Sequence, residues 1–121
     1  MGHCWMKIGL LALFSLLMIS CTVMEDAPLY TWYDYGVVRA RYRKDSTVES
    51  KEALRAEYIN IWLGQKTRRK VVPPGIAAEY GLMLYKEGNT QDGLSYLRKE
   101  MELYPESKAC VSKIINQLQE K

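Results

Sequence analysis

An apolar stretch that ends at a cysteine most constrains what this chain can become. Residues 8–19 form an apolar core, and Lys7 is the only charged residue before Glu25. A membrane-spanning helix needs about 20 apolar residues, whereas the hydrophobic region of a secretory signal has about 7–15. A buried helix of a cytosolic protein would need a polar face, which residues 10–18 do not offer. We therefore expect residues 1–20 to be a signal peptide that is removed. We also expect Met6 rather than Met1 to be the true start of the chain.

The residues at the exit of this segment, Met18-Ile19-Ser20-Cys21, resemble the bacterial lipobox. The resemblance implies that the signal is cut before Cys21 and that this cysteine carries three acyl chains. At about 0.8 kcal/mol for each buried CH₂ group, such an anchor is essentially permanent. Thr22 rather than aspartate follows the cysteine, which favours sorting to the outer membrane, facing the periplasm. The alternative is a free Cys21 after ordinary cleavage.

Cleavage before Cys21 would also remove the chemistry that most enzymes need. The single histidine, His3, lies in the signal, so Ser–His and Cys–His nucleophile pairs and most zinc sites are excluded. Paired carboxylates at catalytic spacing and glycine-rich phosphate loops are also missing from the sequence. We expect no enzyme, no cofactor, no metal and no small-molecule substrate. Cys110 has no partner for a disulfide, and we expect it to be a small core residue on a helix; a redox or intermolecular role is the alternative.

The mature chain has the apolar periodicity of an all-α protein. After a tether over residues 21–34, the domain over residues 35–121 contains about five helices. Leu54, Tyr58, Ile61 and Trp62 form the buried stripe of the second helix, and Ser46-Thr47-Val48-Glu49 matches a capping box at its start. The expected helices span residues 35–45, 49–64, 76–87, 90–104 and 106–119.

Two surface segments each allow two interpretations. Four of the seven residues 30–36 are aromatic, which indicates either a binding patch or a cap over the end of a small helical core. Residues 49–70 hold six basic and three acidic residues and end in the basic run 66–70. This run is either a solvated loop or a contact for lipid phosphates or an acidic partner. Export makes nucleic acid an improbable ligand.

Residues 74–107 resemble one degenerate 34-residue tetratricopeptide unit, which is a pair of antiparallel helices. Gly81 stands at the small position between the two helices, and Pro105 is the closing proline. The chain departs from the template at Ala77, at Gly93, where alanine is usual, and at Glu100, where alanine is also expected. No second repeat is present, so helices 49–64 and 106–119 are expected to cap the unit.

The order of motifs along the chain resembles a family of small bacterial envelope lipoproteins of unknown function. The motifs are the lipobox, the aromatic segment with Trp32, and the sequences VPPG, AEYG and LYPES over residues 72–75, 78–81 and 103–107. The resemblance implies a tetratricopeptide-like fold. It also implies frequent encoding beside a lipoprotein similar to the curli secretion pore, which is a possible partner. No catalytic residues carry over, and Tyr33 replaces a glycine that is common in the family.

The third expected helix is almost wholly apolar. In tetratricopeptide units one side of the first helix faces a binding groove. The corresponding row here is Ala78, Leu82 and Tyr85, with Lys86 at its edge. This row either receives a partner segment or is core covered by helix 49–64. The favoured function is a lipid-anchored adaptor or assembly factor in a cell-envelope complex. The alternative is a pilot lipoprotein that binds a client segment and carries it to the outer membrane.

Lipidation of Cys21 is directly testable. We expect cells grown with labelled palmitate to incorporate label into the protein, and Cys21→Ser to remove both the label and the membrane association, because the acyl chains supply the anchor. The readout is fluorography of the purified protein. A Cys21→Ser protein that is labelled as strongly as the unaltered one would contradict the prediction.

Overall fold

The computed structural model describes residues 27–120, and these form five α-helices and one short 3₁₀-helix without a strand. The expected signal peptide and the lipidation of Cys21 lie outside the described residues. The elements are α2 (Tyr35–Asp45), α3 (Val48–Leu63), α4 (Ile76–Lys86), α5 (Thr90–Leu103), η2 (Pro105–Ser107) and α6 (Lys108–Gln119). The predicted all-helical fold is confirmed. Within residues 27–120, every helix is too short or too polar to cross a membrane.

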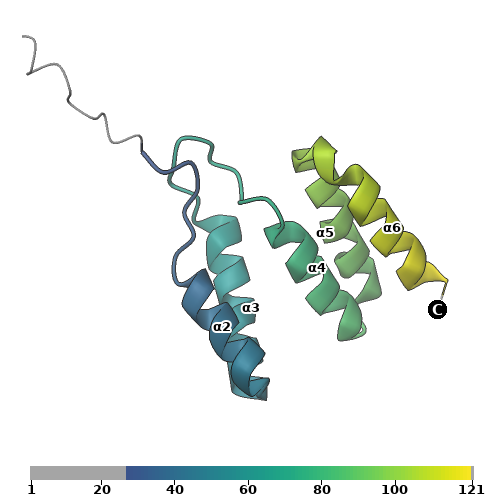
Figure 1. Cartoon of the computed structure of the whole chain (residues 1–121), viewed down its shortest axis with the longest axis horizontal. Coiled ribbons are helices and arrows are strands. Elements are labelled where there is room, and N and C mark those ends of the chain that lie inside the picture. Colours follow the sequence, from purple (N-terminus) through teal and green to yellow (C-terminus); the bar gives the residue numbers. More distant parts are fainter. Residues whose placement is uncertain (1–26, 121) are drawn as a thin grey trace, which may run out of the picture.

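The helices form two packed units that a loop connects (Figure 1). The α2–α3 pair is one unit, and α4, α5 and α6 are the other, in which α4 and α5 make the most extensive contact. The pairing of α4 with α5 confirms the predicted αα-hairpin. The backbones of α3 and α4 approach each other at few positions, so side chains make most of the contact between the two units.

The turn between α2 and α3 differs by one residue from the predicted capping box. Ser46 has a left-handed backbone conformation, with φ of 43°, and ends α2 by donating its N–H to the Tyr42 carbonyl. Thr47 is therefore the N-cap of α3, and its hydroxyl accepts a hydrogen bond from the Ser50 N–H at 3.2 Å. The prediction that Ser46 opens the capping box was wrong, because the tight turn commits that residue to the end of the preceding helix.

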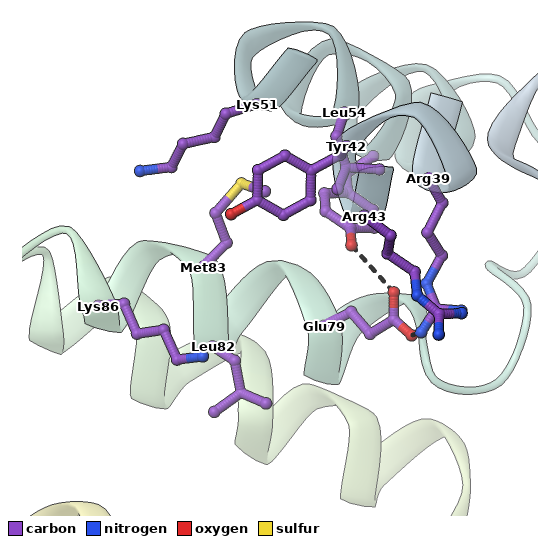
Figure 2. A pocket seen from close by; sticks show the side chains of 10 residues that line it. Arg39, Tyr42, Arg43, Lys51, Leu54, Glu79, Leu82, Met83 and Lys86 are labelled. Carbon is purple, nitrogen blue, oxygen red and sulfur yellow. Dashed lines mark hydrogen bonds and ion pairs between the residues drawn. The ribbon is translucent and has the colours of Figure 1, made fainter. Parts of the chain in front are cut away.

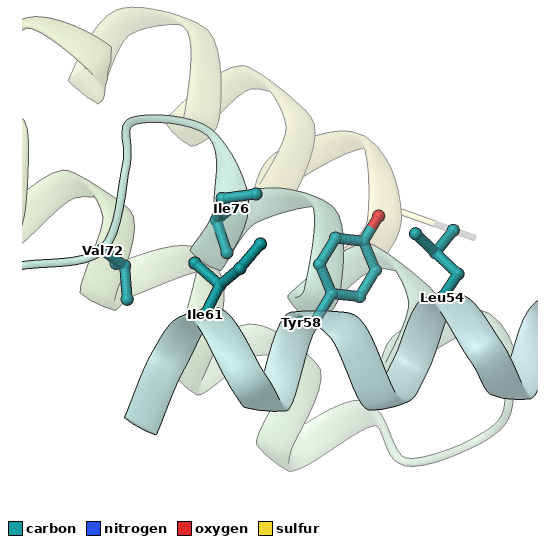
Figure 3. Close-up of a cluster of buried hydrophobic side chains, with 5 residues drawn as sticks. All are labelled: Leu54, Tyr58, Ile61, Val72 and Ile76. Carbon is teal, nitrogen blue, oxygen red and sulfur yellow. The ribbon is translucent and has the colours of Figure 1, made fainter. Parts of the chain in front are cut away.

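Two clusters of buried side chains form the core. The first joins the predicted stripe of α3, namely Leu54, Tyr58 and Ile61, to Val72 in the loop and Ile76 at the start of α4 (Figure 3). The half-buried Trp62 packs against the same cluster. The first cluster therefore connects the two helical units.

The second cluster lies inside the α4–α6 unit. It consists of Leu97 from α5 with Val111 and Ile115 from α6, and Ile114 and Leu118 pack against it. The predicted buried stripe of the last helix is thus confirmed. Cys110 is exposed, so the prediction that it is a core residue was wrong. It precedes Val111 by one residue, and one residue is a rotation of about 100° around a helix.

Two glycines allow α4 and α5 to approach closely. A Cβ added at Gly81 would lie 2.7 Å from the Gly93 carbonyl oxygen, and a Cβ at Gly93 would lie 2.7 Å from the Gly81 carbonyl oxygen. Real Cβ atoms do not approach an oxygen so closely, so each glycine is required by the other's backbone. This reciprocal contact explains why Gly93 replaces the alanine of the tetratricopeptide pattern.

Side chains in α5 and directly after it form hydrogen bonds with the backbone just before the start of α4. Gly75 precedes the helix with φ of 93°, and its N–H donates to Oε1 of the buried Glu100 at 2.7 Å. The hydroxyl of the buried Tyr104 donates to the Val72 carbonyl at 2.6 Å. Glu100 therefore stands where the template has alanine because its side chain satisfies the first amide of this turn.

We expect replacement of glycine by alanine to destabilise the protein at Gly93 and to stabilise it at Gly36. Gly93→Ala should lower the free energy of unfolding by about 1–3 kcal/mol because the added methyl group forces α4 and α5 apart. Gly36→Ala in α2, where no atom lies within 4 Å of an added Cβ, should raise it by up to about 1 kcal/mol through helix propensity. Urea unfolding followed by circular dichroism measures both. A Gly93→Ala protein as stable as the unaltered one would refute the close-approach argument.

Candidate partner-binding cleft

The predicted row on α4 is divided between two environments. Ala78 and Leu82 pack against the second core cluster, and the Tyr85 hydroxyl donates to the Leu118 carbonyl at 2.8 Å. This row therefore faces the α5–α6 side of the unit. Ala78 and Leu82 thus pack as core, as one of the two interpretations expected, but the cluster that they join comes from α5 and α6 rather than from helix 49–64.

A cleft of about 550 Å³ lies between the α2–α3 pair and α4. Of the four residues predicted to bind a partner, Leu82 and Lys86 line this cleft, whereas Ala78 and Tyr85 do not. The volume is within the range of about 300–1,000 Å³ that is common for binding sites. The lining residues are Arg39, Tyr42 and Arg43 from α2, Lys51, Leu54 and Tyr58 from α3, and Glu79, Leu82, Met83 and Lys86 from α4.

Glu79 is the only acidic residue of this lining, and its carboxylate is fully engaged. It accepts hydrogen bonds from the hydroxyls of Tyr35, at 2.6 Å, and Tyr58, at 2.9 Å. It also forms an ion pair with Arg39 at 2.9 Å. Three donors from α2 and α3 thus converge on one side chain of α4, and they compensate its negative charge. The remaining charge of the cleft is positive.

A second ionic contact lies near the end of α4. Glu87 forms an ion pair with Lys51 at 2.6 Å and another with Arg55, and both partners are on α3. Hydrogen bonds from Arg55 and Lys51 lower the pKa of the Glu87 carboxyl. This contact joins α3 to the α4–α5 turn at one margin of the cleft and occupies Lys51.

Two cations of the cleft remain available to a ligand. Arg43 from α2 and Lys86 from α4 are exposed and form no ion pair with any residue from 27 to 120. In Figure 2, Tyr42 and Met83 lie between the Lys51–Lys86 side of the cleft and the Arg39–Arg43 side. The cleft thus presents an apolar middle with positive charge on both sides. This arrangement suits an apolar segment that carries carboxylates.

The sequence already indicated that Glu79 is unusual, although helical periodicity did not predict its role. Glu79 and Lys86 are the only charged residues in the apolar helix α4. A charged side chain in such a helix must find partners or solvent. The partners Tyr35, Arg39 and Tyr58 come from two other helices, so only the tertiary structure identifies them.

The aromatic segment caps the core and also exposes part of its surface. Trp32 packs against Tyr35 with ring centroids 5.6 Å apart, and Tyr35 continues to Tyr58 at 6.1 Å. The series continues through Tyr80 and Tyr96 to Trp62. Trp32 and Tyr33 nevertheless remain 43% and 46% exposed. The two interpretations of this segment are therefore compatible with each other.

Side chains of the kinds that could hold a metal ion are dispersed along residues 27–120. Between residues 27 and 120, no three histidine, cysteine, aspartate or glutamate side chains lie together as a metal site would require. The cleft's own groups are cations, phenols and one engaged carboxylate. They can bind a ligand by charge and apolar contact.

The chain matches a known family model over most of its described length. A family model described as a domain of unknown function, DUF4810, matches residues 29–114. No curated protein and no solved structure matches the chain. The matched range covers the aromatic segment, the cleft and most of α6.

The phenols at Glu79 predict a loss of stability in alkali. Burial, together with the hydrogen bond to Glu79, raises the pKa of Tyr35 and Tyr58 above the ordinary value of 10.0. The unfolded chain therefore loses these protons first, so their contribution to stability is complete below about pH 10 and is lost as the pH rises above it. Urea midpoints measured between about pH 9 and pH 11 should fall, and Tyr58→Phe should reduce the slope. An unchanged slope in Tyr58→Phe would contradict this assignment.

Proposed function

The chain belongs to the DUF4810 family, a domain of unknown function, and we propose that it is a lipid-anchored adaptor or assembly factor in a bacterial cell-envelope complex. In this proposal, acylated Cys21 holds the protein on the outer membrane, facing the periplasm. The cleft between α2–α3 and α4 binds a protein partner. A curli-secretion-pore-like lipoprotein is the partner that the family resemblance suggests.

One observation carries the proposal: the cleft combines an apolar middle with unpaired cations on opposite walls. Tyr42, Leu82 and Met83 supply apolar surface, and burying such surface drives association. Arg43 and Lys86 supply charge that no described acidic residue neutralises. A peptide segment or helix with apolar side chains flanked by carboxylates complements both properties.

The proposed site keeps two of the four residues that the sequence predicted to bind a partner. Leu82 and Lys86 stay in the proposed site, while Ala78 and Tyr85 contact the cluster and carbonyl of the α5–α6 side. Arg43 and Tyr42 enter the proposed site from α2. Leu82→Glu is a poor test of binding, because Leu82 also packs against the core and its replacement would destabilise the fold.

The proposal predicts a crosslink that depends on cleft charge. A photo-reactive amino acid at Tyr42, in the full lipidated chain, should crosslink to one envelope protein in intact cells. Arg43→Glu combined with Lys86→Glu should reduce the crosslinked product at least tenfold, because charge reversal repels an acidic segment. Immunoblotting of membrane extracts measures the product.

Two controls make this experiment decisive. Arg98→Glu with Lys113→Glu makes the same charge change at exposed positions of α5 and α6 and should leave the crosslink intact. The photo-reactive group at Val37, which is 65% exposed on α2 and outside the cleft lining, should not yield the product. Equal loss in both charge variants would refute the cleft as the binding site. A mislocalised client without a stable crosslink would instead favour the pilot function.

A further inference from the structure

A second surface combines exposed apolar side chains with unpaired cations at the end of the molecule opposite the cleft's Lys86. Its apolar members are Leu29, Trp32 and Leu63, which are 51%, 43% and 79% exposed. Its basic members, Lys66, Arg68 and Lys70, are all exposed. We call these six residues the anchor-side surface. They come from the first described segment, the end of α3 and the loop that follows it.

Hydrogen bonds hold the two segments of the anchor-side surface together. Gln65 accepts from the Thr31 N–H at 3.0 Å and donates to the Thr31 carbonyl at 2.8 Å. The Thr67 hydroxyl donates to the Leu29 carbonyl at 2.8 Å, and Tyr33 donates to the Gly64 carbonyl at 2.6 Å. The basic loop is therefore fixed beside the aromatic segment, as the adjacent traces in Figure 1 also show.

The charge of this surface is positive and largely uncompensated. Residues 27–34 and 63–70 contain four basic residues and one acidic residue, Asp34. Arg69 lies over the Tyr30 ring and donates to its hydroxyl at 2.8 Å. The three other cations form no ion pair with residues 27–120. Tryptophan with lysine and arginine is the composition that favours a lipid–water interface.

Chain length restricts where this surface can lie in the lipidated protein. Five residues separate Cys21 from Ala27, so Ala27 can lie at most about 20 Å from the acylated cysteine, even with a fully extended tether. The anchor-side surface begins two residues later, at Leu29. Any lipid anchor at Cys21 thus keeps this end of the domain near the bilayer.

We propose that the anchor-side surface rests on the membrane itself. Trp32, Leu29 and Leu63 enter the interfacial layer, and Lys66, Arg68 and Lys70 bind the phosphates of anionic lipid headgroups. The orientation depends on the proposed anchor, whereas the affinity of this surface for lipid does not. Because Lys51 and Lys86 lie at the far ends of α3 and α4, this orientation turns the cleft away from the bilayer and toward the periplasm.

The test of lipid affinity uses the chain from Thr22 to Lys121 without lipid. It contains every contact described for residues 27–120, and it retains the acidic Glu25 and Asp26 next to the surface. We expect it to sediment with vesicles of phosphatidylcholine mixed with phosphatidylglycerol, and not with pure phosphatidylcholine. Lys66→Gln, Arg68→Gln and Lys70→Gln together should weaken binding roughly 10- to 100-fold. Circular dichroism verifies that each variant folds.

Matched controls separate this surface from general positive charge and general hydrophobicity. Arg98→Gln, Lys108→Gln and Lys113→Gln remove the same charge from α5 and α6 and should leave binding unchanged. Leu63→Gln should weaken binding several-fold, whereas Val48→Gln should not. These two residues are equally exposed at 79% and begin and end α3, about 22 Å apart along its axis. Equal losses in the paired variants, or no binding to anionic vesicles, would overturn the proposal.

A second measurement examines the anchored protein. With Trp62→Phe, Trp32 is the only tryptophan after the signal, and brominated lipids should quench its fluorescence in vesicles that carry the acylated protein. Absence of quenching would refute membrane contact even where the acyl anchor is present. Quenching without the Tyr42 crosslink would support this surface and refute the partner-binding function, so the two proposals fail separately.

Discussion

The carboxylate of Glu79 is the polar contact on which the arrangement of the two helical units depends. It comes from α4, and it accepts from Tyr35 and Arg39 of α2 and from Tyr58 of α3. Few other contacts join α3 to α4 directly, so the loop, the first core cluster, Glu79 and the Glu87 ion pairs set the angle between the units. The same contact neutralises the only acidic group of the cleft. One side chain therefore both holds the walls in place and leaves the cleft positively charged.

The geometry inside the second unit follows from a different constraint, the backbone contact between Gly81 and Gly93. Close approach of α4 and α5 brings Ala78 and Leu82 against the second core cluster, which side chains of α5 and α6 form. Ala78 and Tyr85 are thereby turned away from the cleft, whereas Leu82, which also packs against the core, and Lys86 at the edge of the row line it. The binding surface that we propose is thus a consequence of how a single tetratricopeptide-like hairpin is capped: α6 covers one side, and the α2–α3 pair leaves the other side partly open.

Local patterns predicted the elements well, because helical periodicity and capping depend on near neighbours in the sequence. The stripe of Leu54, Tyr58 and Ile61 and the small position at Gly81 are examples. The predictions were wrong where two neighbouring residues could play the same role, or where the side of the helix on which a residue lies decides its burial. Ser46 and Thr47 can both cap a helix, and the tight turn selects Thr47. Cys110 adjoins buried residues in sequence, yet one step around the helix exposes it. Glu79 was recognisable as an isolated acid in an apolar helix, but its partners were not.

Composition and periodicity alone therefore determine that the described part of the domain is all-helical, roughly where each helix lies and which faces are apolar, because these properties follow from interactions within a few residues. Resemblance to the lipobox likewise predicts lipid attachment at Cys21, which lies outside the described residues. The tertiary structure decides which faces meet and which stay open. Arg43 and Lys86 are 43 residues apart, and Leu29 and Lys66 are 37 apart. Whether such pairs share a surface depends on the path of the loop over residues 64–75 and on the packing of α6, and neither is encoded in any local window.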